Sequence, residues 1–374
     1  MNIYALSFLM MIIMVLAEIS ILKLVKAKTI PWLEIIANLH SGQVVMWLFR
    51  TVEIVLFGLL VRHFNFHWVD QWPIALQWLF AFIAWDLCFY WMHRLHHKIP
   101  LLWSIHRVHH QGENMNLTLA MRNSWYSSLS NFPFIAVLAL LGVPLEIFIV
   151  ISSIHYSVQF YNHTALVDKS GVLDKVLVTP SNHRVHHGLQ DIYSNRNFGG
   201  TLLIWDIVFN TYQPERADTK PKYGLSEPMV SYNPLWFNHK WLFDFINKHA
   251  MQRKQRRQLK LPAGFIALLG LLLFGLVIFY INEQARFTNL AQWSFFTVLS
   301  LASISIGAMS DNKRWGLLLW LALFTLFPIY IVSVVPLYST MLWIILTMLV
   351  LSALAAVLLF FKRSVIAIQS IDSD

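Results

Sequence analysis

DLCFYWMHRLHHK, at residues 86–98, decides the fold of this chain, because an apolar helix ends here in a run of histidines. One stripe of that helix, at intervals of three or four residues, is formed by Asp86, Tyr90, His93 and His97. The residues before Asp86 are apolar for about the length of a bilayer crossing. The stretch therefore predicts a membrane helix that continues into water and carries two imidazoles on one face.

The same histidine pattern returns twice along the chain. HRVHH stands at 106–110 and again at 183–187, after HRLHH at 93–97. Residues three and four apart share one helix face, so each cluster directs two or three imidazoles at one place. Neutral imidazole is the commonest side-chain metal ligand near physiological pH. The sequence therefore predicts a metal site built from eight histidines: His93, His97, His106, His109, His110, His183, His186 and His187.

Other histidines suit an interfacial or hydrogen-bonded role, and histidine runs can also form basic surface patches. The three clusters differ because they share one spacing and lie beside apolar segments, where unpaired imidazoles are costly to bury. They exceed the needs of one zinc ion, and no HExxH motif is present. Nitrogen ligands with room for oxygen suit iron, so two iron ions are expected. Cys88 is the single cysteine, which excludes a resident iron–sulfur cluster, and no GxGxxG loop is present. Electrons must therefore come from outside the chain.

The chain as a whole is too apolar for a soluble domain. Of its 374 residues 57% are hydrophobic, and its mean hydropathy is +0.55. Glu18 lies inside the first apolar segment, which lacks the basic leader and cleavage site of a signal peptide and is therefore retained as a span. We predict an all-α, multi-pass membrane bundle with spans at 4–22, 43–61, 73–91, 262–281, 292–309, 315–334 and 338–361.

The apolar segment 132–160 calls for a different path. Gly142-Val143-Pro144 interrupts it, and proline with glycine breaks a helix. A single crossing would also place the third histidine cluster on the opposite side from the other two. We therefore predict a hairpin that enters the bilayer, turns at residues 142–144 and returns to the same face.

Lysine and arginine give the orientation. With the N-terminus outside, the histidine-rich lobe falls in the cytoplasm together with the basic residues that flank the spans and clusters: Lys23, Lys26, Lys28, Arg94, Lys98, Arg107, Arg253, Lys254, Arg256, Arg257, Lys260, Lys313, Arg314, Lys362 and Arg363. The formal charge of +9 then indicates attraction to anionic lipid head groups and no nucleic-acid binding. Residues 236–260, aromatic and then basic, predict an interfacial helix, with a solvated linker as the alternative. We expect residues 1–260 to carry the histidine chemistry, and residues 261–374 to form four spans of unknown role.

Two acidic residues are candidates for supporting the chemistry. Asp86 sits at membrane depth, where an acid is costly, and metal-bound imidazoles often donate to a carboxylate. Glu113 follows His109 and His110 by one turn, so we expect it to point toward the metal site. We favour a role for Glu113, together with Asn116 and Arg122, in binding substrate or reductant. The alternatives for Glu113 are direct ligation, partnership with an imidazole, and a surface charge pair with Arg122 or a neighbour.

The sequence resembles the fatty acid hydroxylase/sterol desaturase superfamily of membrane histidine-box di-iron enzymes. The resemblance covers about residues 73–227 and is most similar to the alkylglycerol monooxygenase branch. It is carried by DLCFYWMHRLHH, LLWSIHRVHHQGENMNLTLAMRNS, QFYNHT, VTPSNHRVHHG and NRNFGGTLLIWDIVFNTY. It implies a four-helix membrane core under a cytoplasmic lobe, with O2 as co-substrate attacking a lipid C–H bond. It also implies His163 as a further metal ligand, excludes His96, and leaves His155 unassigned.

The resemblance leaves the substrate and the electron donor open. The ether-adjacent carbon of an alkylglycerol is one target; sterols, carotenoids and acyl chains, hydroxylated or desaturated, are the alternatives. The external reductant is either tetrahydrobiopterin or a redox protein such as a reductase. A histidine-rich metal transporter is the alternative from another class, but it predicts polar residues throughout the spans. Here the ionisable residues concentrate at one face.

Overall fold

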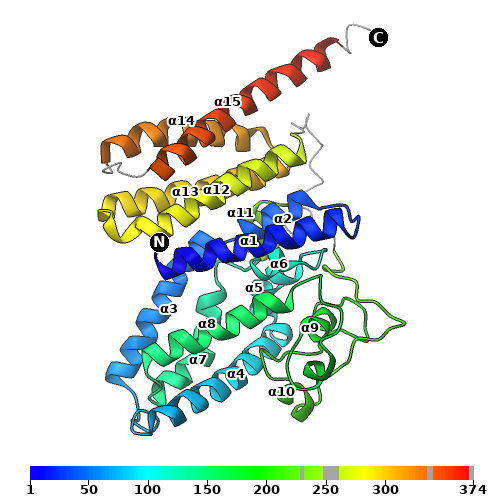
Figure 1. Ribbon diagram of the computed structural model, residues 1–374, viewed down its shortest axis with the longest axis vertical. Coiled ribbons are helices and arrows are strands. Elements are labelled where there is room, and N and C mark those ends of the chain that lie inside the picture. Colours follow the sequence, from blue (N-terminus) through cyan, green and yellow to red (C-terminus); the bar gives the residue numbers. More distant parts are fainter. Residues whose placement is uncertain (228–230, 247–260, 335–339, 370–374) are drawn as a thin grey trace. The chain divides into compact units, whose positions relative to one another are not determined.

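The computed structural model describes residues 1–227, 231–246, 261–334 and 340–369. In these residues it contains helices, turns and one isolated β bridge, between Leu177 and Leu202 (Figure 1). The all-helical class predicted from the sequence is therefore confirmed. The helices are α1 Ile3–Leu24, α2 Trp32–Leu39, α3 Gln43–His63, α4 Ile74–Lys98, α5 Pro100–His110, α6 Leu117–Ala120, α7 Ser127–Leu140, α8 Leu145–Asn162, η1 Gly171–Lys175, α9 Pro180–His186, α10 Ile204–Val208, α11 Pro234–Ile246, α12 Ala263–Glu283, η2 Gln284–Arg286, α13 Asn289–Ser310, α14 Arg314–Val334 and α15 Thr340–Gln369.

The chain forms two compact units. The histidine unit comprises Ala17–Lys28 and Val45–Met229 and contains all three clusters. The second unit comprises Met1–Leu16, Thr29–Val44 and Val230–Asp374. The functional boundary predicted at residue 260 and the basic run before it lie outside the described residues, as does the second half of the predicted interfacial helix. The first half of that helix is α11.

The core of the histidine unit lies between α3, α4, α7 and α8. Phe57 of α3 stacks on Phe148 of α8, with ring centroids 3.9 Å apart. Trp85 of α4 stacks on His155 of α8 at 4.1 Å. This arrangement agrees with the four-helix core that the resemblance implies. Apolar side chains of α4, α7 and α8 fill the rest of the core: Ala81, Phe89, Ile135, Leu138, Ala139, Ile147 and Ile151.

The two helices of the predicted hairpin are present as α7 and α8, and their path into the bilayer and back stays a prediction. Their connection carries Gly142 at φ +88°, a left-handed conformation that glycine adopts without steric cost. The turn is tied to the α3–α4 connection, because Phe66 N donates to Leu140 O at 2.7 Å and Val69 N donates to Leu141 O at 3.0 Å. The other ends of α7 and α8 therefore lie with the C-terminal end of α4, where the first histidine cluster stands.

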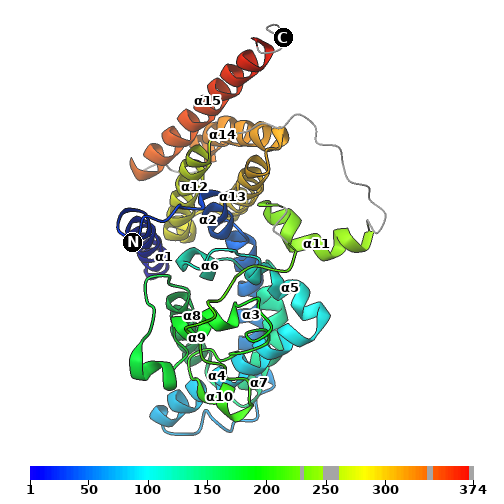
Figure 2. The ribbon, with the colours of Figure 1, turned by 90° about the vertical axis from the view of Figure 1, so that its right-hand side faces the viewer.

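The histidine-rich lobe gathers at that end of α4. It comprises α5, α6, α9 and α10 with their long connections, and α9 packs against α8 (Figure 2). Pro100 begins α5, with only Ile99 between it and the end of α4, and Pro180 begins α9. Proline suits the first turn of a helix, where its missing N–H leaves no hydrogen bond unmade. The two prolines thus determine where the helices that carry the second and third histidine clusters begin.

Six helical segments in the described residues are long and apolar enough to cross a membrane. They match the predicted spans 4–22, 43–61, 73–91, 262–281, 292–309 and 315–334, three of which extend slightly beyond the observed segments, so a multi-pass membrane protein is confirmed. The seventh predicted span, 338–361, begins outside the described residues. Its described portion, Leu342–Leu358, is a shorter apolar helix within α15.

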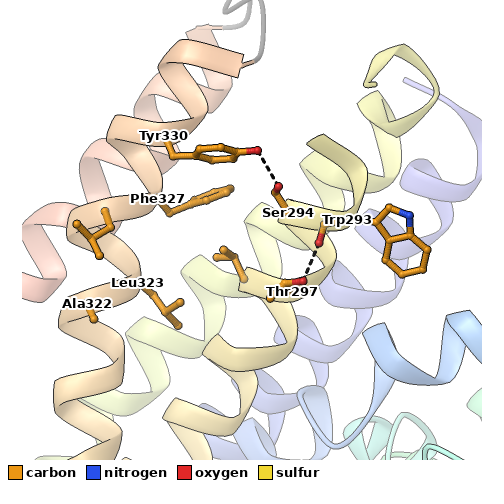
Figure 3. Close-up of a pocket in the computed structure, with 9 residues that line it drawn as sticks. Trp293, Ser294, Thr297, Ala322, Leu323, Phe327 and Tyr330 are labelled. Atoms are coloured by element: carbon orange, nitrogen blue, oxygen red, sulfur yellow. Dashed lines mark hydrogen bonds between the residues drawn. The ribbon is translucent and has the colours of Figure 1, made fainter. Parts of the chain in front are cut away.

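The second unit is built around α12, which packs against α2, α13 and α15. The Ile36 side chain of α2 packs directly on the backbone of α12, since a Cβ at Gly270 would stand 2.6 Å from Ile36 Cδ1. A cavity of about 450 Å³ opens between α13 and α14 (Figure 3). Apolar side chains line most of it, and a hydrogen bond of 2.8 Å joins Ser294 Oγ to Tyr330 Oη at one side. We assign no chemistry to this cavity.

The hairpin makes a testable prediction about topology. In a Cys88→Ser background, Ser127→Cys at the start of α7 and Asp168→Cys after α8 should react with a membrane-impermeant thiol reagent from the same side, the cytoplasm. His67→Cys, in the connection tied to the hairpin turn, should react from the opposite side. Labelling of Ser127→Cys and Asp168→Cys from opposite sides would mean one crossing and would contradict the hairpin.

Candidate metal centre

The structure brings the nine predicted histidines together in two groups within the histidine unit. In each group the ligand nitrogens lie within 4.8 Å of one another. The five-histidine group consists of His93, His97, His106, His110 and His186. The four-histidine group consists of His109, His163, His183 and His187.

Each HRVHH pentapeptide is divided between the two groups. Its first and fifth residues lie one helical turn apart and go to the same group, as His106 and His110 do. Its fourth residue is rotated by about 100° from the fifth and goes to the other group, as His109 does. In the first cluster the equivalent residue is His96, whose Nε2 instead bonds to Ser130 Oγ at 3.0 Å. His163, at the C-terminal end of α8, completes the four-histidine group.

Backbone carbonyls orient four of the nine rings. In each case Nδ1 donates to a carbonyl oxygen at 2.7 to 3.0 Å, so Nε2 is left without a proton in the neutral ring. Such partners fix the tautomer and direction of metal-binding imidazoles. The pairs are His93 with Phe198, His109 with Arg122, His163 with Gln159, and His186 with Arg196.

The nitrogens that remain are arranged for a cation. His109 Nε2 and His163 Nε2 are 3.2 Å apart, and neither has a proton to donate to the other. Two facing lone pairs repel unless a positive ion lies between them. In the five-histidine group, His97 Nε2 is buried and has no hydrogen-bond partner among the described residues. The donor set of both groups therefore fits metal ions.

Burial keeps the lobe imidazoles neutral and available as ligands. It lowers the pKa of His109 to about 4 and the pKa of His186 to about 3. Burial, followed by the charge of neighbouring imidazoles, also places the pKa of His183 and His187 well below the usual value. Near pH 7 these rings need lose no proton before a metal ion binds.

The loop that carries two of the orienting carbonyls is held by Asp206. Its carboxylate accepts from Phe198 N at 2.7 Å and from Gly199 N at 2.8 Å, and it also accepts from Thr211 Oγ1. Burial raises the pKa of Asp206. Asp206 thus fixes the segment whose Phe198 carbonyl orients His93. The sequence reasoning missed it, although an acid inside the apolar stretch LLIWDIV was a signal.

Asp86 supports the neighbouring backbone and lies outside both groups. It accepts from Thr201 N at 2.8 Å, from Leu202 N at 3.0 Å and from Trp205 Nε1 at 2.9 Å. The imidazole beside it is His155, at 3.3 Å, which belongs to neither group. The carboxylate–imidazole contact expected for Asp86 is thus made with His155, and the metal-binding rings use carbonyls instead.

Arginines near the clusters hold the lobe from within. Arg122 is fully buried; its Nε donates to Val108 O at 2.7 Å, and one of its terminal nitrogens donates to Gln111 Oε1 at 2.9 Å. Arg184, inside the third cluster, donates to Val167 O and pairs with Glu215 at 2.8 Å. Both residues tie the clusters to adjacent chain segments. The sequence predicted that Arg122 binds substrate or reductant and predicted no role for Arg184.

Glu113 lies in the turn after α5 and is exposed, outside both groups. A Cβ added at Gly224 would stand 3.2 Å from Glu113 Cγ, so the side chain lies against residue 224. The expectation that it points at the metal ligands is therefore wrong: α5 ends at His110, and the chain leaves the helix before Glu113.

Comparisons with known proteins agree with this architecture. Residues 78–211 match the family described as fatty acid hydroxylase. The alkylglycerol monooxygenase of Danio rerio is 40% identical over 173 residues, 46% of this chain and 38% of that protein. The alkylglycerol monooxygenase of Homo sapiens is 33% identical over 198 residues, 52% and 43% respectively. The ornithine lipid hydroxylase of Rhizobium tropici is 31% identical over 177 residues, 45% and 50%. No solved structure matches the chain.

Residues 78–211, which contain the three histidine clusters, thus resemble the fatty acid hydroxylase family and lie in a multi-pass membrane protein. The recognition made from the boxes is confirmed, including the similarity to alkylglycerol monooxygenases. The matched segments span less than half of the length of both monooxygenases, at 38% and 43%. The similarity supports a lipid hydroxylase, that is, an oxidoreductase that acts in the membrane.

Proposed function

We propose that this chain is a monooxygenase that holds two iron ions in its two histidine groups and uses O2 to hydroxylate a membrane lipid. The observation that carries the proposal is the pair of imidazole groups, each with ligand nitrogens within 4.8 Å of one another. Histidine nitrogens with room for oxygen suit iron. Bound iron would supply the O2 chemistry that no side chain can perform.

The residues of the chain position the reaction and keep water out. The carbonyls of residues 122, 159, 196 and 198 hold the ligand rings in one orientation. The groups lie where α4 passes from the four-helix core into the lobe, so a lipid would enter laterally from the bilayer. Buried rings around the site exclude bulk water from the reacting carbon.

An alkylglycerol, hydroxylated at its ether-adjacent carbon, is the substrate we favour, because the relatives from Danio rerio and Homo sapiens are alkylglycerol monooxygenases. One oxygen atom of O2 enters the C–H bond, and two electrons and two protons from an external donor reduce the other atom to water. The hydroxylated carbon is then a hemiacetal, which collapses to an aldehyde and free glycerol lipid. Tetrahydrobiopterin and a redox protein remain the two proposed donors.

The proposed orientation places the metal centre on the cytoplasmic face, with basic residues against anionic lipid head groups. We also propose that residues 1–260 suffice for the chemistry and that the last spans have a separate role. Asp86 supports the reaction through the backbone of residues 201 and 202, without touching the metal.

The decisive experiment combines metal analysis with lipid turnover. The purified chain should contain about two iron ions per chain and should consume O2 with a mixture of alkylglycerols, sterols, carotenoids and acyl lipids, once a reductant is added. Aldehyde release from alkylglycerol supports the favoured substrate. An ornithine lipid is added to the same mixture as a second candidate substrate, because the Rhizobium tropici relative is an ornithine lipid hydroxylase, and its hydroxylation would favour that substrate. A desaturated product or an iron-free protein would contradict the proposal.

Because Glu113 is exposed, its proposed role in binding substrate or reductant can be tested separately from metal binding. Glu113→Gln keeps the size and removes the charge, so iron content should stay at the wild-type value while turnover falls about tenfold, as for loss of one charge-assisted hydrogen bond. Asp191→Asn, an exposed acid of the same lobe, is the matched control and should retain full turnover. Unchanged turnover in Glu113→Gln would reduce Glu113 to a surface charge, and lost iron would make it a ligand.

A further inference from the structure

Glu18 is a buried acid in α1 that the proposed chemistry does not use. Its side chain is 1% exposed, and the segment Ala17–Lys28 belongs to the histidine unit. An acid in an apolar span is costly to bury unless strong partners compensate for the lost water. The hydrogen-bond partners of Glu18 therefore indicate which parts of the chain it stabilises.

The Glu18 carboxylate accepts hydrogen bonds from three donors, which belong to two distant segments of the chain. Oε2 accepts from Leu117 N at 2.6 Å. Oε1 accepts from Thr164 Oγ1 at 2.7 Å and from Ala165 N at 2.7 Å. The partners stand 99 to 147 residues further along the chain, so the carboxylate joins two parts of the lobe that are far apart in the sequence.

Both segments lead directly to ligands of the four-histidine group. Thr164 directly follows the ligand His163. Leu117 begins α6, and shortly after this helix comes Arg122, whose carbonyl orients the ligand His109. His109 Nε2 and His163 Nε2 are the facing pair at 3.2 Å. One carboxylate thus supports the backbone on both sides of that pair. Among the described residues, no hydrogen bond of Glu18 reaches the segment whose carbonyls orient His93 and His186 of the five-histidine group.

We propose that Glu18 is a positioning residue that sets the spacing of His109 and His163, and that it acts on the four-histidine group alone. The inference rests on the proposed function in so far as that group holds a metal ion. The carboxylate is required because all three partners donate. Glutamine would turn an amide N–H toward at least one donor, which breaks a charge-assisted bond and leaves a buried N–H or hydroxyl unmatched.

Cobalt titration of the metal-free chain tests this inference without turnover. Co²⁺ bound by imidazoles absorbs visible light, so each ion can be counted as it binds. The wild type should bind two ions. In Glu18→Gln one ion should keep its affinity while the other binds about 10- to 100-fold more weakly, the usual cost of losing an outer partner.

Three further variants separate positioning from general destabilisation. Glu53→Gln removes another buried acid of the same unit, which pairs with Arg50 away from the histidines; it should lower stability and leave both cobalt affinities unchanged. Thr164→Val removes a donor to Glu18 and should weaken the same ion, whereas Thr164→Ser keeps the hydroxyl and should restore it. Thr164→Val and Thr164→Ser also test the positioning role of Glu18 if Glu18→Gln does not fold.

Two results would overturn the inference: wild-type affinity for both ions in Glu18→Gln and Thr164→Val, or equal weakening of both ions. A wild type that binds no cobalt is a different outcome, because it would remove the proposed metal function itself. A wild type with two ions and an unchanged Glu18→Gln would leave that function intact and refute only the role of Glu18.

Discussion

His186→Ala and His109→Ala should each remove a metal ion and lower lipid turnover by more than about 100-fold. Loss of a residue that only orients a metal ligand costs up to about 100-fold, and loss of the ligand itself should cost more. His186 belongs to the five-histidine group and His109 to the four-histidine group, so the two variants address different ions. Each ring is buried and oriented by a carbonyl, and alanine leaves that carbonyl without its donor. Metal content per chain and aldehyde release measure the two effects.

His96 provides the matched control. It stands beside His97 in the first cluster, but its ring bonds to Met92 O and Ser130 Oγ and lies outside both groups. His96→Ala should therefore retain both metal ions. If His186→Ala and His109→Ala kept both ions, or if His96→Ala lost one as readily, the assignment of ligands would be refuted.

Asp206→Asn should produce the second large effect. Its two carboxylate oxygens accept from Phe198 N and Gly199 N, and asparagine can offer an acceptor to only one of them. The unmatched buried N–H should lower the free energy of unfolding by about 1–3 kcal/mol. Since Phe198 O orients His93, one metal ion, that of the five-histidine group, should bind about 10- to 100-fold more weakly.

Thermal unfolding and cobalt titration measure both parts of that prediction. Asp218→Asn is the control, because Asp218 is exposed in the same lobe and pairs with Arg216 at the surface. It should behave as wild type in both measurements. Loss of stability in Asp206→Asn with unchanged metal affinity would show that the loop supports folding alone and does not set the direction of His93.

The histidines could be predicted from the sequence because spacing on a short helix is a local property. His106 and His110 are separated by one turn, which fixes their common face before any tertiary contact forms. The hairpin followed from a geometric requirement, since Gly142 and Pro144 allow a turn and one site needs all clusters together. His163 was reached through the resemblance, because a lone histidine after an apolar helix carries no pattern of its own.

The supports of the site were beyond local reasoning. Glu18 meets partners 99 or more residues away, and only the folded chain shows which backbone N–H groups it faces. Asp86 was singled out correctly as a costly membrane acid, but its partners are main-chain groups of residues 201 and 202. Glu113 failed for a different reason: the helical periodicity used to aim it stops at His110, where α5 ends.

The carbonyl partners of the histidines determine which kinds of change this centre can survive. A carbonyl oxygen is present whatever the side chain, so residues 159, 196 and 198 can be exchanged without removing the group that orients His163, His186 or His93. The path of the main chain has no such freedom. A one-residue insertion or deletion between His187 and Phe198 would shift two orienting oxygens at once. The centre is therefore tolerant of substitution in this loop and sensitive to its length.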